Sequence, residues 1–348
     1  MKNIPLNSSS AKLLGRTLFR GEKLWLTHSA SGCEFIFTGR TLRLTVGCDA
    51  DAYKNGQRCN KPRVAVLCDG RPVVKKVVDE LSETYTIVDS AAPVTKSIRI
   101  VKLSEAAFSL ASVSDAVTDD EAHISPAPAG KLRIEFIGDS ITCGYGIDDS
   151  NMQSDFATEA ENAMKSYAYI AAELLKADYS MFSYSGYGLI SGYTPDGERN
   201  SRELIMPWYE TAGFSHCSLD GQKLQDIPWD FSAAQNNIVV VNLGTNDNSF
   251  CTFDSSRYDE FTEAYMRFLK TIRRCEPDAL IICSIGTITP EPMPFIKKAV
   301  SRLNDNRILT FQFTQQNGLL GFGSNWHPSE DTQLAAGEEL ARFIDSLI

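Results

Sequence analysis

The stretch Ile134-Glu135-Phe136-Ile137-Gly138-Asp139-Ser140-Ile141-Thr142 decides the fold that this chain is expected to adopt. Its first half is an apolar run that predicts a buried strand, and the following Gly-Asp-Ser ends that strand. In open α/β folds a strand that stops in this way brings the next side chain to the carboxyl edge of a parallel sheet, where ligands bind. The hydroxyl of Ser140 is therefore our candidate nucleophile.

Strand and helix patterns alternate through the rest of the chain. Strands are predicted at 132–137, 179–184, 238–243, 280–285 and 308–313, and helices around 166–176, 258–274 and 329–347. Strand, helix and strand in repetition require crossover connections, which produce a parallel sheet. We therefore predict a three-layer α/β domain over residues 131–348.

The first 125 residues show another pattern, of short runs in which apolar and polar residues alternate. Such runs predict strands at 24–26, 33–37, 42–46, 64–67, 73–78 and 98–101. Asp69-Gly70 has the chemistry of a hairpin turn between two of them. We predict an antiparallel β-sandwich over residues 1–125, and we expect the acidic, proline-containing stretch 119–130 to be a linker that neither packs nor pairs.

Charge is distributed unevenly between these two parts. The net charge is −10, but residues 1–130 carry 17 Lys and Arg against 14 Asp and Glu, whereas residues 131–348 carry 17 against 30. An acidic catalytic half repels polyanions, so a neutral substrate is expected and nucleic acid is not an expected partner. The acidic run at 146–161 is expected to form a loop over the site that repels charged substrates.

The composition also bears on compartment and cofactors. Nine cysteines are an odd number without zinc-finger spacing, and we interpret them as reduced thiols. The first residues lack an apolar signal region, and no window approaches the roughly 18 apolar residues of a membrane span. We therefore expect a cytoplasmic protein with no membrane partner. Scattered histidines and solvated acidic runs predict neither a metal nor another cofactor.

Acyl transfer needs a base beside the nucleophile, and the chain has only four histidines. His327 is the strongest candidate, because it directly precedes Pro328 and the last predicted helix. His28 falls in the predicted sandwich and His123 in the predicted linker. His216 is the one competitor, and its neighbours form no pattern that we can connect with catalysis.

Two further positions could stabilise the charge that develops on the substrate oxygen. Gly186 follows a predicted strand, and a residue without Cβ lets the backbone approach a ligand closely, with Gly188 as the alternative. Asn246 follows the apolar run 238–243, and its amide offers N–H donors without a charge. A purely turn-forming asparagine is the alternative interpretation.

Together, three segments resemble the SGNH (GDSL-type) hydrolases, a family of serine esterases. They are Gly138-Asp139-Ser140, Gly244-Thr245-Asn246-Asp247 and Trp326-His327-Pro328. This resemblance implies an oxyanion hole made by the backbone N–H groups of Ser140 and Gly186 and by the side-chain amide of Asn246. Most members of the family carry an aspartate three residues before the histidine, where this chain has Ser324. We therefore predict a Ser140–His327 dyad, in which the Nδ1–H donates to a backbone carbonyl or to the side chain of Asn325. A carboxylate from another segment of the chain is the alternative acceptor.

A strand-rich N-terminal domain followed by these motifs resembles carbohydrate esterase family two, in which that domain is a jelly roll. The resemblance implies removal of acetyl groups from fragments of xylan or glucomannan without a cofactor. An acetylated oligosaccharide is thus the expected partner, and the β domain is expected to wall one side of the cleft. The candidate sugar-binding aromatics are Trp326, Tyr187, Tyr145 and Trp208.

Two alternatives stay open from the sequence. The first is the same chemistry on another acyl substrate, such as a lipid or a thioester. The second is a carbohydrate-binding protein whose hydrolase half is inert, an idea supported only by the absence of the aspartate at position 324. The sequence leaves open which sugar and hydroxyl are used, whether acetyl is transferred to other sugars, and whether the protein is a monomer or a homodimer.

Overall fold

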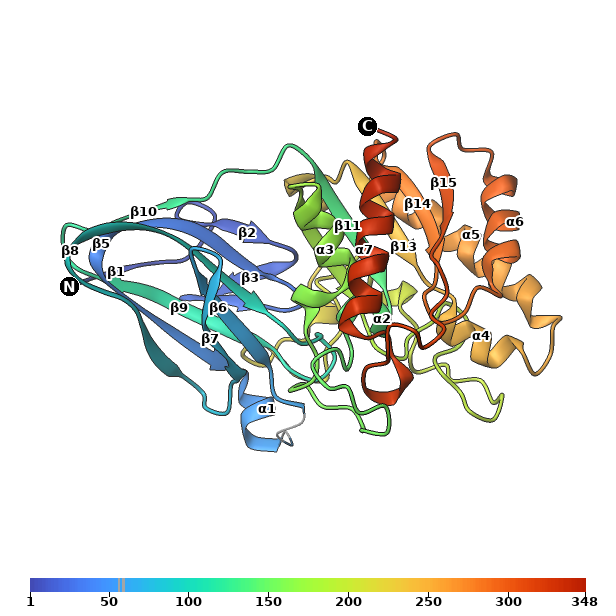
Figure 1. The fold of residues 1–348 in the computed structure, drawn as a ribbon, viewed down its shortest axis with the longest axis horizontal. Helices are drawn as coiled ribbons and strands as arrows, with labels where there is room; N and C mark the ends of the chain where they lie inside the picture. The colour runs from blue at the N-terminus through green and yellow to red at the C-terminus, as the bar shows by residue number, and fades with distance from the viewer. Residues whose placement is uncertain (56, 58–59) are drawn as a thin grey trace.

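The computed structural model describes residues 1–348 with the exception of 56 and 58–59, and it contains two domains side by side (Figure 1). The β domain ends with strand β10, His123–Pro126, and the α/β domain begins with strand β11, Arg133–Gly138. Within the described residues, no helix combines the length and the apolar character needed to cross a bilayer.

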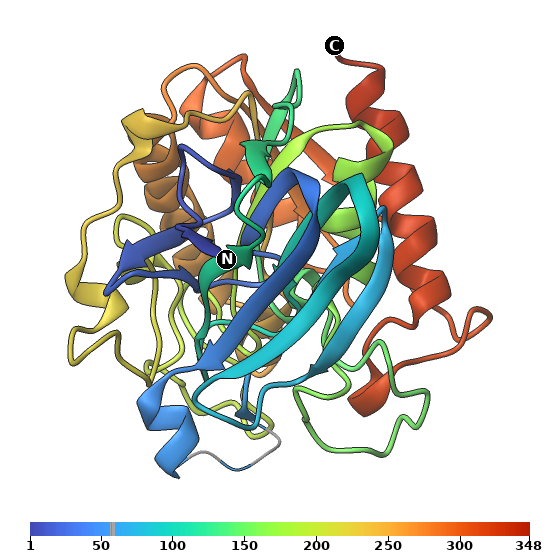
Figure 2. The ribbon, with the colours of Figure 1, turned by 90° about the vertical axis from the view of Figure 1, so that its left-hand side faces the viewer.

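In the β domain, the described strands form one antiparallel sheet. Its main order is β3-β4-β9-β5-β8-β6-β7, with β1 on β9 and with β2 and β10 on β5. The remaining strands are β1 (Lys2–Ile4), β2 (Lys12–Leu14), β3 (Thr17–Arg20), β4 (Lys23–Leu26), β5 (Gly32–Cys48), β6 (Arg63–Cys68), β7 (Arg71–Val77), β8 (Glu83–Lys102) and β9 (Ala111–Thr118). The only helix described here is α1, Ala50–Asn55. The sheet curls around its own core (Figure 2), so the prediction of an antiparallel β domain is confirmed.

Strand β5 joins two strands that the sequence predicts as separate. The pairing of β5 with β8 shifts register between Gly39 and Thr41 and again between Leu42 and Arg43. Such irregularities bend a strand without ending it. The apolar residues on both sides of the bend, Phe35, Phe37, Leu42 and Leu44, are therefore all buried in one core.

The prediction that residues 119–130 form a linker without pairing is wrong, because part of this stretch forms a strand. Strand β10 adds to β5 in antiparallel register, with Ile124 opposite Phe37. Ala122 and Ile124 are buried whereas His123 between them is exposed, which is the alternation of an edge strand. The acidic and proline residues around this short alternation hide it in the sequence.

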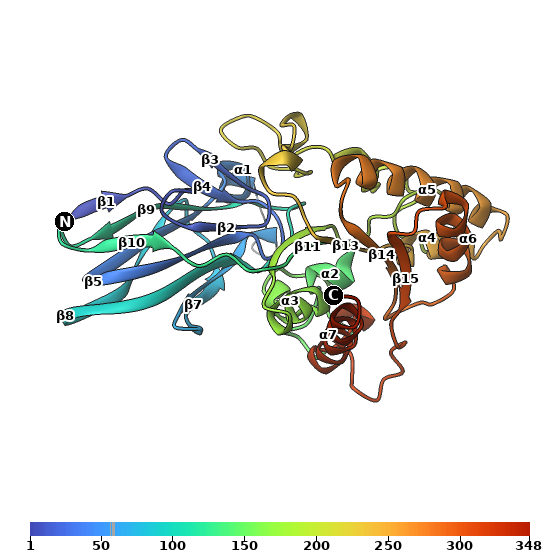
Figure 3. The ribbon, with the colours of Figure 1, turned by 90° about the horizontal axis from the view of Figure 1, so that it is seen from above.

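The α/β domain has a parallel sheet in the order β12-β11-β13-β14-β15. Its other strands are β12 (Asp178–Ser183), β13 (Ile238–Asn242), β14 (Leu280–Ile285) and β15 (Ile308–Gln312). One face is covered by α3 (Tyr167–Leu174) and α7 (Glu330–Asp345), and the other by α5 (Arg257–Cys275) and α6 (Met293–Leu303) (Figure 3). Because β12 and β13 lie on opposite sides of β11, the carboxyl end of β11 is a topological switch point, where open sheets bind ligands.

Buried and half-buried charges join the two domains. The guanidinium of Arg16, from the β domain, donates to the carbonyl oxygens of Tyr209 and Thr211 at 2.7 and 2.6 Å. It also pairs with the Glu135 carboxylate on β11 at 3.1 Å.

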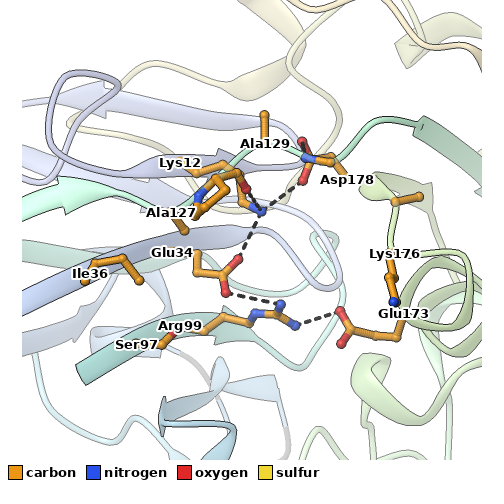
Figure 4. Close-up of a pocket in the computed structure, with 13 residues that line it drawn as sticks. Lys12, Glu34, Ile36, Ser97, Arg99, Ala127, Ala129, Glu173, Lys176 and Asp178 are labelled. Atoms are coloured by element: carbon orange, nitrogen blue, oxygen red, sulfur yellow. Dashed lines mark hydrogen bonds and ion pairs between the residues drawn. The ribbon is translucent and has the colours of Figure 1, made fainter. Parts of the chain in front are cut away.

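A second joint surrounds a cavity of about 360 Å³ at the amino edge of the parallel sheet (Figure 4). There Lys12 pairs with Asp178 at 2.9 Å and with Glu34 at 3.1 Å, and Arg99 pairs with Glu173 at 2.8 Å. Both cations of this joint thus pair with carboxylates of the α/β domain.

Candidate active site

Ser140 stands where the sequence predicts it, at the carboxyl end of β11. Asp139 caps the short helix α2, Ser140–Cys143, by accepting the Ile141 N–H on its carboxylate at 3.0 Å. Ser140 is therefore the first residue of that helix, and its backbone N–H has no partner within the helix. The strand and the cap together hold Ser140 in the lining of a cleft.

The Nε2 atom of His327 lies 2.9 Å from the Ser140 Oγ atom. The other ring nitrogen, Nδ1, lies 3.1 Å from the backbone oxygen of Asn325. A carbonyl can only accept, so Nδ1 carries the proton and Nε2 is free to accept the Ser140 O–H. Of the acceptors that the sequence leaves open, the geometry places a backbone carbonyl at the imidazole.

A tight turn before the histidine produces this arrangement. Residues Ser324–Trp326 form a 3-10 turn in which Asn325 and Trp326 have φ values of +50° and +62°. This left-handed backbone is unfavourable for side-chain-bearing residues, and here it turns the Asn325 carbonyl back toward the ring. Ser324 is buried, and its N–H donates to the carbonyl of Gly146 at 3.1 Å.

The Tyr145 ring stacks on the His327 imidazole, with 3.9 Å between ring centroids and 23° between ring planes. This tyrosine lines the cleft and is 7% exposed, so most of its ring surface packs within the protein. Desolvation by burial lowers the pKa of His327 to about 4, while the Asn325 carbonyl raises it by a smaller amount. The imidazole is therefore neutral at physiological pH, as a general base must be.

Gly186 and Asn246 line the same cleft as Ser140 and His327. Gly186 has a φ of +83°, which a residue with a side chain rarely adopts. Asn246 is on α4, Thr245–Cys251, and its Nδ2 donates one hydrogen to the Tyr187 carbonyl at 2.9 Å. That bond orients the amide, and the second Nδ2 hydrogen is left for a ligand.

Asp247 fixes the loop that follows Gly186, a function that the sequence analysis did not assign. Its buried carboxylate accepts the backbone N–H groups of Leu189, Ile190 and Ser191 at 2.9, 2.7 and 3.3 Å. Burial raises the pKa of Asp247 to about 6, although these bonds oppose the shift. The sequence pointed to this residue only through the motif Gly244-Thr245-Asn246-Asp247, in which an acidic residue follows the asparagine that supplies the amide.

The cleft has a volume of about 600 Å³ and an aromatic rim. Trp326 and Tyr193 line it and are 52% and 58% exposed, so both offer free ring surface. Phe108, from the β domain, also lines it and lies 4.9 Å from Phe156 between ring centroids. The β domain thus forms part of the cleft wall, as expected.

Two of the predicted sugar-binding aromatics lie outside the lining of the cleft. Tyr187 is buried, with its ring packed 5.1 Å from that of Tyr184. Trp208 stacks on Phe214 at 5.2 Å, at the edge of the core under the sheet. Neither lines the cleft, because apolar rings beside a core gain more from burial than from exposure.

The structure also separates the remaining histidines from the cleft lining. His28 is buried, with Nε2 2.9 Å from the Ala212 carbonyl, and burial lowers its pKa to about 3. His216 lies against Phe214, and His123 is exposed on β10.

Sequence reasoning missed Tyr193, Phe108, Phe156 and Glu203, which all line the cleft. They come from irregular segments without a recognisable motif. The acidic loop contributes Phe156, but its Asp148 is paired with Arg63, Lys75 and Lys165 at 2.8 to 2.9 Å. The carboxylate of Asp148 is therefore already paired with cations of the protein.

One group of possible metal ligands occurs among the described residues. The carboxylates of Glu105 and Glu161 and the Cys143 thiol bring ligand atoms within 4.8 Å of one another. All three are buried, and the buried ammonium of Lys102 is their neighbour. A positive charge is thus already supplied by the protein.

Residues 136–319 match the GDSL-like lipase/acylhydrolase family. The chain belongs to this family. Residues 13–128 match the carbohydrate esterase 2 N-terminal domain, so the acylhydrolase domain follows a β domain of that class.

Proteins similar to this chain include named esterases. The chain is 32% identical over 290 residues to cellulase/esterase CelE of Acetivibrio thermocellus, a match that covers 80% of this chain and 33% of CelE. It thus spans about a third of that relative. An acetylxylan esterase/glucomannan deacetylase of Cellvibrio japonicus is 24% identical over 314 residues, covering 87% of this chain and 80% of that protein. The solved structure of a family two carbohydrate esterase from Clostridium thermocellum, in complex with cellohexaose, has a TM-score of 0.80 and 27% identity, covering 97% of this chain and 98% of its own.

Proposed function

We propose that this acylhydrolase is a serine esterase that removes O-acetyl groups from plant-derived oligosaccharides, such as fragments of acetylated xylan or glucomannan. The observation that carries the proposal is the 2.9 Å contact between the Ser140 Oγ and the unprotonated Nε2 of His327, in the lining of an aromatic cleft. The named activities of the relatives, acetylxylan esterase and glucomannan deacetylase, support the substrate class.

In the first half of the reaction, the Ser140 oxygen attacks the acetyl carbonyl carbon while His327 Nε2 takes the hydroxyl proton. The carbonyl oxygen becomes negative and is stabilised by the backbone N–H groups of Ser140 and Gly186 and by the Asn246 amide. His327 then gives the proton to the departing sugar oxygen. The products of this half are the free sugar hydroxyl and an acetylated Ser140.

In the second half, water attacks the acetyl group of Ser140 and His327 takes a proton from that water. Collapse of the second tetrahedral intermediate breaks the bond to Ser140, which recovers its proton from His327. Acetic acid leaves and the enzyme is restored. The Asn325 carbonyl holds the imidazole in the required tautomer throughout, in place of the carboxylate of a triad.

The cleft chemistry favours a neutral sugar over a charged one. Trp326 and Tyr193 provide the exposed rings on which pyranose C–H groups can stack. Among the described residues that line the cleft there is no lysine or arginine, and Glu203 adds a carboxylate. We place the sugar over these rings, with its acetyl group pointing to Ser140.

The test is acetate release from acetylated xylo- and manno-oligosaccharides, with the lost acetyl group located by NMR. We expect release by the parent, and a loss of about 10³-fold or more in both Ser140→Ala and His327→Ala, since members of such a unit act together. An inactive parent would direct the search to nitrophenyl esters of increasing chain length, which test other acyl groups. Sugar binding by an entirely inactive parent would establish the binding-protein alternative.

We further propose a jelly roll for the curled sheet of the β domain and a reducing compartment for the protein. The first rests on the match to the carbohydrate esterase 2 N-terminal domain. The second is supported by the free thiols of the eight cysteines in the described part of the chain, Cys59 lying outside it.

A further inference from the structure

A cluster of buried titratable groups lies where the two domains meet, and the proposed reaction uses none of them. Lys102 and Glu105 come from the end of β8 and the segment after it, and Glu161 comes from the acidic loop. All three are at most 1% exposed, as is Cys143 on the nucleophile's helix α2. Burying charged groups is costly unless they are paired, so this cluster requires an explanation.

Hydrogen bonds connect this cluster to residues 185–193, which we call the oxyanion loop because they include Gly186. The Glu105 carboxylate accepts the backbone N–H of Ser185, the residue before Gly186, at 3.1 Å. The Glu161 carboxylate accepts the backbone N–H of Glu105 at 3.2 Å. The carbonyl of Gly186 accepts the Tyr193 N–H at 2.8 Å, so the loop is tied on both sides of the glycine.

The carboxyl groups of Glu105 and Glu161 lie close together inside this cluster. The second oxygens of Glu105 and Glu161 are buried without a partner among the described residues, and their carboxyl groups lie within 4.8 Å of each other. Burial raises the pKa of both carboxyls. Burial also lowers the pKa of the Lys102 ammonium, to about 8, and its Nζ donates to the backbone carbonyls of Ser104 and Glu105.

We propose that Glu105, supplied by the β domain, is a positioning residue for the oxyanion hole, and that it acts through its hydrogen bond to the N–H of Ser185. This inference rests on the proposed esterase function. Gly186 has a backbone conformation that is open to several alternatives, because glycine restricts its own φ and ψ least. The hydrogen bond to the Ser185 N–H limits these alternative conformations. The Gly186 N–H therefore already points toward the substrate oxygen when that oxygen becomes negative.

The test compares two single variants of Glu105. Glu105→Gln keeps the reach and an oxygen that can accept the Ser185 N–H, and it removes only the ionisable group. Glu105→Asp keeps the carboxylate but shortens the reach by one methylene. We expect kcat for p-nitrophenyl acetate to stay within about 3-fold of the parent in Glu105→Gln. In Glu105→Asp we expect it to fall about 10- to 100-fold with little change in KM, which is less than the 10²–10³ lost when a donor is removed.

A matched control exists at the opposite edge of the sheet. The buried carboxylate of Glu276 accepts the backbone N–H of Asn236 at 3.0 Å, outside the residues that line the cleft. Glu276→Asp makes the same chemical change in a similar environment, and we expect it to leave kcat within about 2-fold. Equal losses of kcat in Glu276→Asp and Glu105→Asp would show a general packing effect and overturn the proposal.

Other outcomes would also overturn it. They are a Glu105→Asp variant as active as the parent, a Glu105→Gln variant that loses more activity than Glu105→Asp, a change confined to KM, or a parent that EDTA inactivates and Zn²⁺ restores. If the parent itself fails to hydrolyse any acyl ester, the proposed function fails first. Parent activity that depends on Ser140 thus separates the two proposals.

Discussion

The proposed base, His327, is oriented by an uncharged acceptor, the backbone carbonyl of Asn325. A carboxylate at Nδ1 would both orient an imidazole and favour its protonated form, whereas the Asn325 carbonyl orients it without adding a charge. Desolvation therefore dominates, and it lowers the pKa of His327 to about 4. The stacked ring of Tyr145 contributes to that burial.

The pH profile should report this residue directly. Below its pKa His327 is protonated and cannot take the Ser140 proton, so activity is lost as the pH falls through that value. We expect kcat/KM for p-nitrophenyl acetate to be level from about pH 5 to pH 8 and to fall below that range with a midpoint near 4. Initial rates in buffers of constant ionic strength measure this. A midpoint at or above 6.5 would show that burial does not control the base.

At the scale of elements, the acidic loop owes its position to ion pairs. Its Asp148 side chain is 12% exposed and lies between Arg63 and Lys75 of the β domain and Lys165 before α3. The lysines and Asn162 outweigh desolvation and hold the pKa of Asp148 well below its usual range. This loop carries Phe156 into the cleft wall, so the ion pairs also shape the site.

Replacing this carboxylate should destabilise the protein near neutral pH. Asp148→Asn leaves Arg63 and Lys75 without the carboxylate that they share, while Lys165 keeps its ion pair with Glu330. We expect it to lower the free energy of unfolding by about 1–3 kcal/mol at pH 7. Because the folded pKa is depressed, the contribution is present above the unfolded pKa near 3.9 and shrinks as the pH falls below it. Urea unfolding at pH 7 and pH 3 measures both effects. Asp149→Asn is the control, and an equal loss there would contradict the prediction.

At the scale of the whole molecule, the two domains share their buried charges and one wall of the cleft. Arg16 crosses from the β domain to carbonyls and a carboxylate inside the α/β domain. Phe108 lines the cleft from the same side, and Glu105 reaches the oxyanion loop. The β domain is therefore a structural part of the site.

Because the domains share this joint, we expect them to unfold in a single transition. We also expect stability to depend strongly on Arg16. Arg16→Met leaves the Glu135 carboxylate buried without its cation, which should cost about 3–5 kcal/mol. Arg20→Met removes an exposed guanidinium of the same domain and should change stability by less than about 0.5 kcal/mol. Calorimetry measures both, and two separate transitions in the parent would contradict the shared joint.

Several features followed from the sequence by itself because they are local. The alternating runs before residue 126 and the strand–helix repetition after 131 reflect periods of two and 3.6 residues, which covalent geometry imposes on any strand or helix. The turn after Ile137 delivers Ser140, the motifs around Gly186 and Asn246 each follow a strand, and the motif around His327 precedes the last helix. These segments could be assigned before their contacts were known.

Other features were decided only by the tertiary structure. The choice of the Asn325 carbonyl depends on a left-handed turn, and the roles of Tyr145 and Trp208 depend on which neighbour each ring meets. Glu105 meets Ser185 across 80 residues of chain. Contacts of this kind arise when whole elements pack, because the free energy of burying a side chain depends on surfaces that no local pattern contains.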